Sequence, residues 1–136
     1  MGGMFGAFSI AGSGMSAERL RMDVVAENIA NANTTRGANG QPYRRKEVIL
    51  QQRGPSFGEV LNGVQVAGVA DDASAPRRVY EPGHPDADAQ GYVTLPNVNP
   101  VTEMVDLITA SRGYEANVQA LNTTKQMAMK TLDLLR

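Results

Sequence analysis

The chain has 136 residues, a formal net charge of −1 and an apolar fraction of 42%, which fits one domain or a small domain with helical extensions. The near-neutral charge argues against a nucleic-acid surface, and no apolar run approaches the roughly 18 residues that span a membrane. The chain contains no cysteine, which excludes disulfides, thiol catalysis and thiolate metal sites. Its first six residues lack the basic segment and apolar core of a cleaved secretory signal.

An amphipathic helix is predicted from Phe8 to about Ala32, where asparagines and then a polar run end the apolar period. Its main apolar seam, interrupted by Glu18, is Ala11, Met15, Glu18, Met22, Val25, Ile29 and Ala32. A second stripe of mostly small residues runs beside it: Ile10, Gly14, Ala17, Arg21, Val24 and Asn28. Small side chains allow close approach, so the second stripe is predicted to contact a neighbouring chain.

The middle of the chain is predicted to be β-rich, with glycine- and proline-rich loops between short strands. The predicted strands are Tyr43 to Gln52, Gly63 to Val69, Arg77 to Tyr80 and Gly91 to Leu95. Gly54-Pro55 is predicted to form a turn, and Gly68 to mark a β-bulge.

A second long helix is predicted from Val101 to Arg136, with Asn99 as its N-cap and Pro100 at its first position. Its seam alternates steps of three and four residues, as in a coiled coil. The seam positions are Met104, Leu107, Ser111, Tyr114, Val118, Leu121, Lys125, Ala128, Leu132 and Leu135.

The expected fold is therefore mainly α with a small β-rich middle, the two terminal helices packing as an antiparallel coiled-coil hairpin. The expected segments are an N-terminal helix in 1–36, the β-rich middle in 37–98 and a C-terminal helix in 99–136. Two narrow seams bury little surface, so further burial on neighbouring copies is expected, and a heterologous contact would generate an open helical array. In the isolated chain, hydrogen-exchange protection is expected to be confined to about Tyr43 to Leu95.

Polar clusters offer weaker functional hypotheses. The spacing of His84, Asp86 and Asp88 could suggest a metal site or part of a triad, but it is interpreted as a solvated, proline-braced loop, and no catalytic, cofactor-binding or metal site is predicted. The run Arg44-Arg45-Lys46 is interpreted as a solvated strand edge. Glu18 and Lys125, which interrupt the two seams, are predicted to pair and fix the helix register.

Several motifs resemble those of bacterial flagellar basal-body rod and hook proteins. Residues Asn28–Thr35 are similar to the signature that closes the first helix of this family, and Ser111–Asn117 with Leu121–Thr123 to its C-terminal helix. The stretches that resemble proximal-rod members more specifically are Pro42–Lys46, Val79–Ala87, Gly91–Val93 and Pro96–Asn99. The loop from Gly37 to Gln41 departs from the usual family composition.

The resemblance implies a structural subunit, not an enzyme, whose terminal helices form the inner layer of a hollow, torque-carrying rod in the periplasm. It implies export through the flagellar type III apparatus without a cleaved signal, and contacts with itself, with proximal and distal rod subunits and with the rod–ring adaptor. No membrane insertion is implied. The residues expected to form the assembly interface are Met15, Met22, Val25, Asn28, Ile29, Asn31, Met104, Leu107, Tyr114, Val118, Leu121, Ala128, Leu132 and Leu135.

Two other functions are compatible with the sequence pattern. One is a soluble cytosolic two-helix adaptor or chaperone, and the other is a small metal-dependent hydrolase built around His84. Replacing Val25 or Leu121 with Asp is expected to leave the β-rich middle intact but to block assembly.

Overall fold

The computed structural model describes residues 2–53 and 63–134 of the chain. In chain order the elements are α1 (Gly2–Ala30), β1 (Lys46–Gln52), β2 (Val64–Asp71), β3 (Arg77–Tyr80), β4 (Tyr92–Leu95) and α2 (Pro100–Leu134). The predicted order of long helix, small β-rich middle and long helix is confirmed. The predicted turn at Gly54-Pro55 and the seam residue Leu135 lie outside the described residues.

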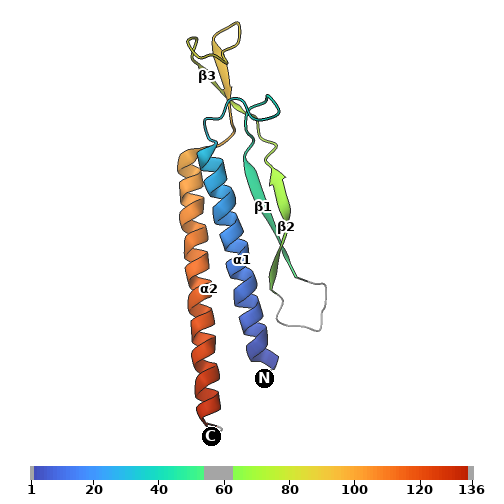
Figure 1. The fold of residues 1–136 in the computed structure, drawn as a ribbon, viewed down its shortest axis with the longest axis vertical. Helices are drawn as coiled ribbons and strands as arrows, with labels where there is room; N and C mark the ends of the chain where they lie inside the picture. Colours follow the sequence, from blue (N-terminus) through green and yellow to red (C-terminus); the bar gives the residue numbers. More distant parts are fainter. Residues whose placement is uncertain (1, 54–62, 135–136) are drawn as a thin grey trace.

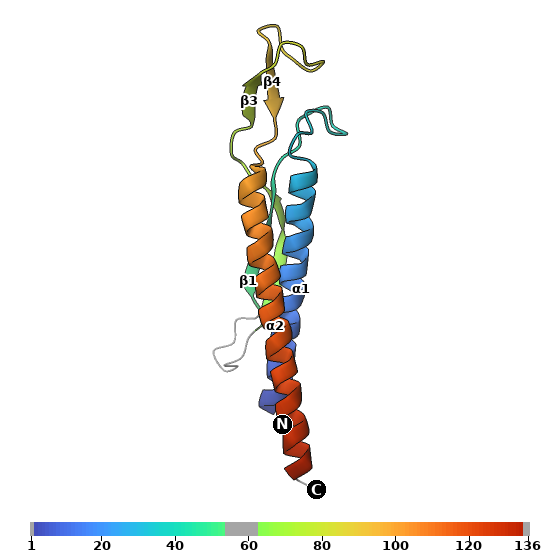
Figure 2. The ribbon, with the colours of Figure 1, turned by 90° about the vertical axis from the view of Figure 1, so that its left-hand side faces the viewer.

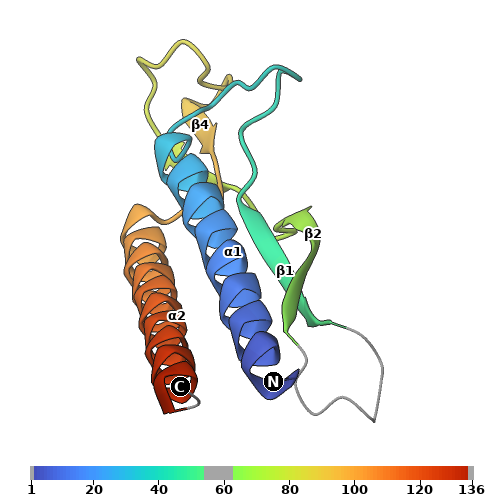
Figure 3. The same cartoon turned by 60° about the horizontal axis from the view of Figure 1, so that its bottom comes forward.

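The helices lie side by side along the length of the molecule. Figure 1 shows α1 running away from the N-terminus and α2 returning toward the C-terminus. Helix α1 contacts α2 on one side and both β1 and β2 on another, so it lies between them (Figure 3). The β3–β4 hairpin stands beyond the loop end of the helices (Figure 2).

Local chemistry explains the helix ends. Helix α1 begins at Gly2, six residues before the predicted start, and its last turn closes with a bond from the Asn31 amide to the Glu27 carbonyl (3.1 Å). The predicted cap of α2 is present, because Asn99 Oδ1 accepts the Val101 amide at 3.0 Å. Pro100 is the first helical residue, where the missing amide hydrogen carries no cost.

Strands β1 and β2 form an antiparallel pair with an irregularity beside Gly68, as the sequence indicates. Ile49 pairs with Gly68 and Leu50 with Val66, so Ala67 is the extra residue. The predicted start of this strand at Tyr43 is wrong, because the ladder begins at Lys46. The Arg45 amide instead donates to Asn97 Oδ1 (2.8 Å), so only the Arg45 carbonyl, which accepts the Asp72 amide at 2.7 Å, still bonds across to the β2 side.

The β1–β2 hairpin is fastened to α1 at the start of β2, the end of the strand pair opposite Lys46 and Asp71. Ser13 Oγ accepts the Val64 amide at 3.1 Å, and a β-carbon at Gly63 would lie only 2.5 Å from the same oxygen. Gly63 therefore allows a contact between strand and helix that a larger residue would prevent.

The core is thin and built from small side chains. Its buried apolar residues are Ala11, Ala17, Val24, Val25, Ala32, Val93, Val98 and Ala110. Such small residues bring the backbones close but remove little apolar area from water. Among the described residues, neither helix combines the length and apolar character that crossing a bilayer requires.

Candidate assembly interface and its polar clamp

The contact between α1 and α2 depends on two glycines, one on each helix. A β-carbon at Gly14 would lie 2.9 Å from the Asn117 side chain, and one at Gly113 would lie 3.0 Å from the Glu18 carboxyl carbon. Each glycine therefore makes room for a polar side chain of the opposite helix. This close approach sets which residues fit between the helices.

The predicted seam of α2 is correct in part: several of its positions are half-buried, but Met104, Lys125 and Leu132 are exposed. The buried residues of α2 are Glu103, Ala110 and Thr124, at seven-residue intervals or multiples of them, rather than the neighbouring Met104, Ser111 and Lys125 of the prediction. Met104 is 52% exposed, because the narrow space between the helices takes small side chains and a paired carboxylate instead. Leu132 is 61% exposed. The register of Asn28 beside Glu103 and Gly14 beside Asn117 places it past Gly2, the first residue of α1.

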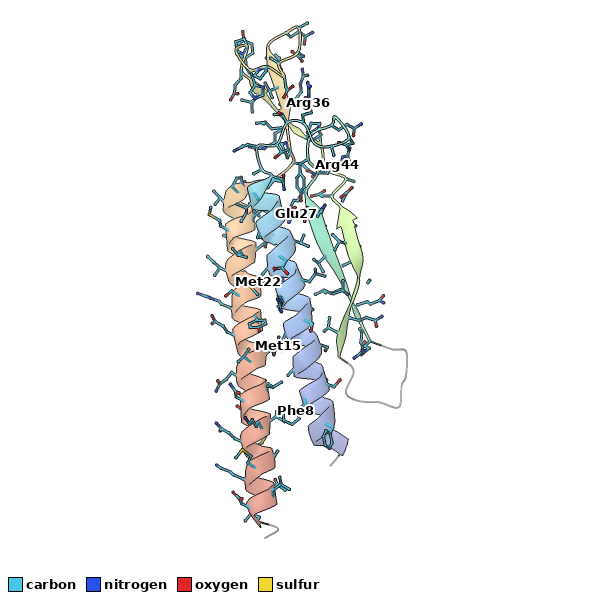
Figure 4. All side chains as sticks on the ribbon, viewed as in Figure 1. Phe8, Met15, Met22, Glu27, Arg36 and Arg44 are labelled. Carbon is cyan, nitrogen blue, oxygen red and sulfur yellow. The ribbon has the colours of Figure 1, made fainter. Side chains whose placement is uncertain are left out.

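The other residues predicted for the interface line the helix pair at varying depth. Val25 and Asn28 are buried between α1 and its neighbours. Half-buried are Met15, Met22, Ile29, Asn31, Leu107, Tyr114, Val118, Leu121 and Ala128. Figure 4 shows Phe8, Met15 and Met22 at successive levels along α1, on the side nearest α2 in this view.

The prediction that the second stripe of α1 contacts a neighbouring chain is wrong. Gly14, Arg21 and Asn28 of this stripe face α2 within the same chain, through Asn117, Asp106 and Glu103. Ala17 and Val24 are buried, and they line the hollows between α1 and the β1–β2 hairpin. The hairpin folds back along α1 and covers the surface that the sequence alone leaves open.

A fully buried asparagine joins three segments at the loop end of the helices. Asn28 Nδ2 donates to Glu103 Oε2 at 3.0 Å and to the Lys46 carbonyl at 2.9 Å. Asn28 Oδ1 accepts the Tyr43 hydroxyl and the Lys46 amide, each at 2.9 Å. All four hydrogen-bonding positions of this side chain are therefore used, which offsets the cost of burying it.

Arg45 is the cationic centre of the same region. Its Nε donates to Glu103, and its guanidinium also pairs with Glu47, with Asp72 at 3.5 Å and with Asp106 at 3.5 Å. Glu103 is 0% exposed, so its charge depends on Arg45 and Asn28 for compensation. We call the four side chains of Asn28, Tyr43, Arg45 and Glu103 the polar clamp.

The electrostatics of the clamp favour this arrangement. Burial is the largest single effect and lowers the pKa of Arg45, but the hydrogen bonds and charges of Glu103 and Glu47 together outweigh it and leave the net pKa above the ordinary value. Burial, and then the charges of Glu27, Asp71 and Glu103, raise the pKa of Tyr43 to about 12. The Tyr43 phenol therefore stays neutral and keeps donating to Asn28 across the physiological pH range.

The sequence did not reveal the role of Arg45, and it assigned the helix register to the wrong residues. The sequence pattern places Arg45 on a solvated edge, yet its side chain is 19% exposed and pairs with Glu103 and Asp106 of α2. The predicted pairing of Glu18 with Lys125 is wrong, because Glu18 lies beside Gly113 and Arg21. Lys125 is exposed and lies about 18 Å farther along α2 than Gly113, counted at 1.5 Å per residue. Asn28 and Glu103 make the buried cross-helix contact instead.

The side chains around His84 are occupied by bonds within their own loop and to the segment that follows α1. His84 Nδ1 accepts the Asp86 amide at 3.0 Å, and the Asp86 carboxylate accepts Thr35 (2.8 Å) and Arg36 (2.6 Å). Asp88 is held by two amides of its loop, which keep the pKa of its carboxyl below the ordinary value. No group of three potential metal ligands gathers anywhere in the described part of the chain.

The features brought together here are those of a scaffold: a thin helix pair, a polar clamp that fixes its register, and apolar side chains facing outward. Residues 8–38 match the sequence model of flagella basal body rod proteins, and residues 89–134 match that of the flagellar basal body rod FlgEFG protein C-terminal region. These matches define a flagellar basal-body rod protein, which is a structural component and not an enzyme.

Relatives that match over nearly the whole chain identify the family within this class of rod proteins. The chain is 47% identical to the flagellar basal-body rod protein FlgC of Bacillus subtilis, covering 96% of this chain and 97% of the relative. It is 50% identical to the FlgC protein of Yersinia enterocolitica and 49% identical to that of Salmonella typhimurium, covering 93% of this chain and 94% of each relative. The chain therefore belongs to the FlgC family, a structural subunit of the bacterial flagellar basal body that assembles with other rod proteins.

Proposed function

We propose that this subunit assembles helically through α1 and α2, packed as an antiparallel coiled-coil hairpin, into the wall of the proximal rod. The wall would enclose the export channel and transmit motor torque as part of a drive shaft. The observation that carries this proposal is the apolar surface left on the helix pair of a single chain. Val101, Met104, Val105 and Ile108 are each more than half exposed, and all four belong to the first two turns or so of α2.

The interface proposed here has two kinds of residue. Exposed apolar residues such as Met104 and Leu132 are available to neighbouring subunits. Buried residues such as Val25 and Asn28 act indirectly, because they hold the two helices in the relative position that presents the outer surface. Half-buried residues such as Leu121 serve both purposes.

The proposed assembly also implies the neighbours and the location of this subunit. The neighbours would be further copies of this chain, other proximal and distal rod subunits and the rod–ring adaptor, in the periplasmic part of the basal body. The chain would reach that position through the flagellar type III export apparatus, without a cleaved signal and without inserting into the membrane. The smallness of the core supports this route, because a thin helix pair is easily unfolded for passage through a narrow channel.

The test is complementation of a strain that lacks this protein, with fractionation of its basal bodies. Val25→Asp and Leu121→Asp place a charge in the helix pair and should abolish swimming and remove the protein from purified basal bodies. Gln119→Asp, on the exposed side of α2, is the matched control and should behave as the wild type. Normal swimming in the Val25 and Leu121 variants would contradict the proposal. Wild-type protein found only in the soluble fraction would instead favour the cytosolic adaptor.

A further inference from the structure

One side of α2 carries two apolar patches with a polar stretch between them. The upper patch is Val101, Met104 and Ile108, which are 70%, 52% and 55% exposed. The lower patch is Met129 and Leu132, which are 57% and 61% exposed. Steps of three and four residues place all five on the same side of the helix. Between the patches this side carries Ser111, Glu115, Val118, Asn122 and Lys125, of which only Val118 is apolar, and it is half-buried.

The lower patch lies where α1 no longer covers α2. The contacts of Gly14 with Asn117 and of Asn28 with Glu103 share one offset along the pair. The same offset places the start of α1 beside Met129, so the last residues of α2 extend about 7 Å past it. Figures 1 and 2 show this projecting end.

The two ends of the helix pair differ in charge. From Glu18 onward in α1 and up to Glu115 in α2, the helices contain six acidic and three basic residues. Arg45 and Lys46 of the β1 region offset part of this excess, and Glu47 and Asp72 restore it. In contrast, α1 has no charged residue before Glu18, and α2 beyond Glu115 has two lysines and one aspartate. The upper end is therefore acidic and the lower end weakly basic.

We propose that the lower patch of one copy binds the upper patch of the next copy, with their α2 helices parallel and displaced along the axis. This contact rests on the proposed rod assembly and specifies which surfaces of the subunit meet. The spacing of Met129 and Leu132 repeats that of Val101 and Met104, so the two patches match over one helical turn. Binding of upper patch to upper patch would instead bring two acidic ends together, which charge repulsion opposes.

Such a contact joins two different surfaces, so it does not close on itself. Each copy keeps a free upper patch at one end and a free lower patch at the other, which permits continued addition. Because the patches match over only about one helical turn, a single contact is weak, and the contact is expected to accumulate only in an array or at high protein concentration.

The absence of native cysteine allows a direct cross-linking test. Single-cysteine variants Met104→Cys and Leu132→Cys are mixed at millimolar concentration and treated with a short bis-maleimide. Cross-linking between the two variants should exceed that of the matched polar-stretch pair, Glu115→Cys with Asn122→Cys, by at least fivefold. Each copy carries a single thiol, so every cross-linked product joins two copies.

A second arm uses basal bodies purified from cells that produce both cysteine variants. A 104–132 link above the control pair in solution and in basal bodies supports the contact. Equal yields for all pairs, or a dominant 104–104 product, would overturn it. If the protein is present in basal bodies but the 104–132 link is absent, only this contact is refuted. If the protein is absent from basal bodies, the proposed function is refuted, and the cross-linking in solution still tests the contact.

Discussion

Replacing Asn28 with Asp tests the polar clamp with almost no change in shape. The new carboxylate keeps the acceptor that serves Tyr43 and Lys46, but it exchanges the Nδ2 donor for an oxygen. That oxygen would lie 3.0 Å from Glu103 Oε2 and 2.9 Å from the Lys46 carbonyl. The substitution therefore turns two buried hydrogen bonds into repulsive contacts.

The expected cost follows from protonation. Two carboxylates at 3.0 Å would repel by about 5 kcal/mol at an effective dielectric constant of about 20, so one of them takes up a proton instead. Holding a carboxyl protonated at pH 7, about three units above its ordinary pKa, costs about 4 kcal/mol. The unmade bond to the Lys46 carbonyl adds about 1 kcal/mol at any pH.

The sign of the pH dependence is a specific consequence. The carboxyl of the variant has a folded-state pKa raised above its unfolded value, so the variant loses stability relative to the wild type as the pH rises from about 4. Urea unfolding followed by circular dichroism should give a deficit of about 5 kcal/mol at pH 7 and about 2 kcal/mol at pH 5. An equal deficit at both values, or none, would refute this account of the clamp.

A second substitution provides the internal control. Glu103→Gln in the Asn28→Asp background supplies an amide donor to the carboxylate introduced at position 28 and retains a carbonyl oxygen that can accept from Arg45. The double variant should recover roughly 3 kcal/mol relative to Asn28→Asp alone at pH 7. Additive losses in the double-mutant cycle would show that the two side chains do not interact directly.

Three further results are expected. Gly12→Ala should stabilise the chain by up to about 1 kcal/mol, because nothing lies within 4 Å of the new β-carbon. Gly14→Ala should not show this gain, because the Asn117 side chain must move to make room, and thermal unfolding of the two variants measures the difference. Alkaline titration followed by tyrosinate absorbance should show a tyrosine that ionises near pH 12 and is missing in Tyr43→Phe. Because a tyrosine in the unfolded chain ionises near pH 10, the stability advantage of the wild type over this variant should decline between about pH 10 and pH 12, and a constant difference over that range would contradict the assignment. Hydrogen exchange should show the strongest protection in the helix ends beside the polar clamp and the weakest in the first turns of α1, contrary to the sequence-based expectation of protection confined to the β-rich middle.

Local chemistry was sufficient to predict most of the secondary structure. The three-and-four spacing of apolar residues identified both helices, and the Asn99-Pro100 pair identified the start of α2. Short β-branched runs between glycine and proline identified the strands, and Gly68 located the bulge. These features depend on neighbours in the chain, which is why periodicity, caps and turn residues were informative.

The tertiary structure decided which side of each helix is buried. Met104 and Glu103 are adjacent, and hydropathy alone selects Met104 for the interior. Glu103 is buried instead because Arg45, more than fifty residues earlier, neutralises it, and because the close approach at Gly14 and Gly113 leaves too little space for larger side chains. A paired charge and a close backbone approach depend on residues distant in sequence, so neither could be inferred from the local pattern.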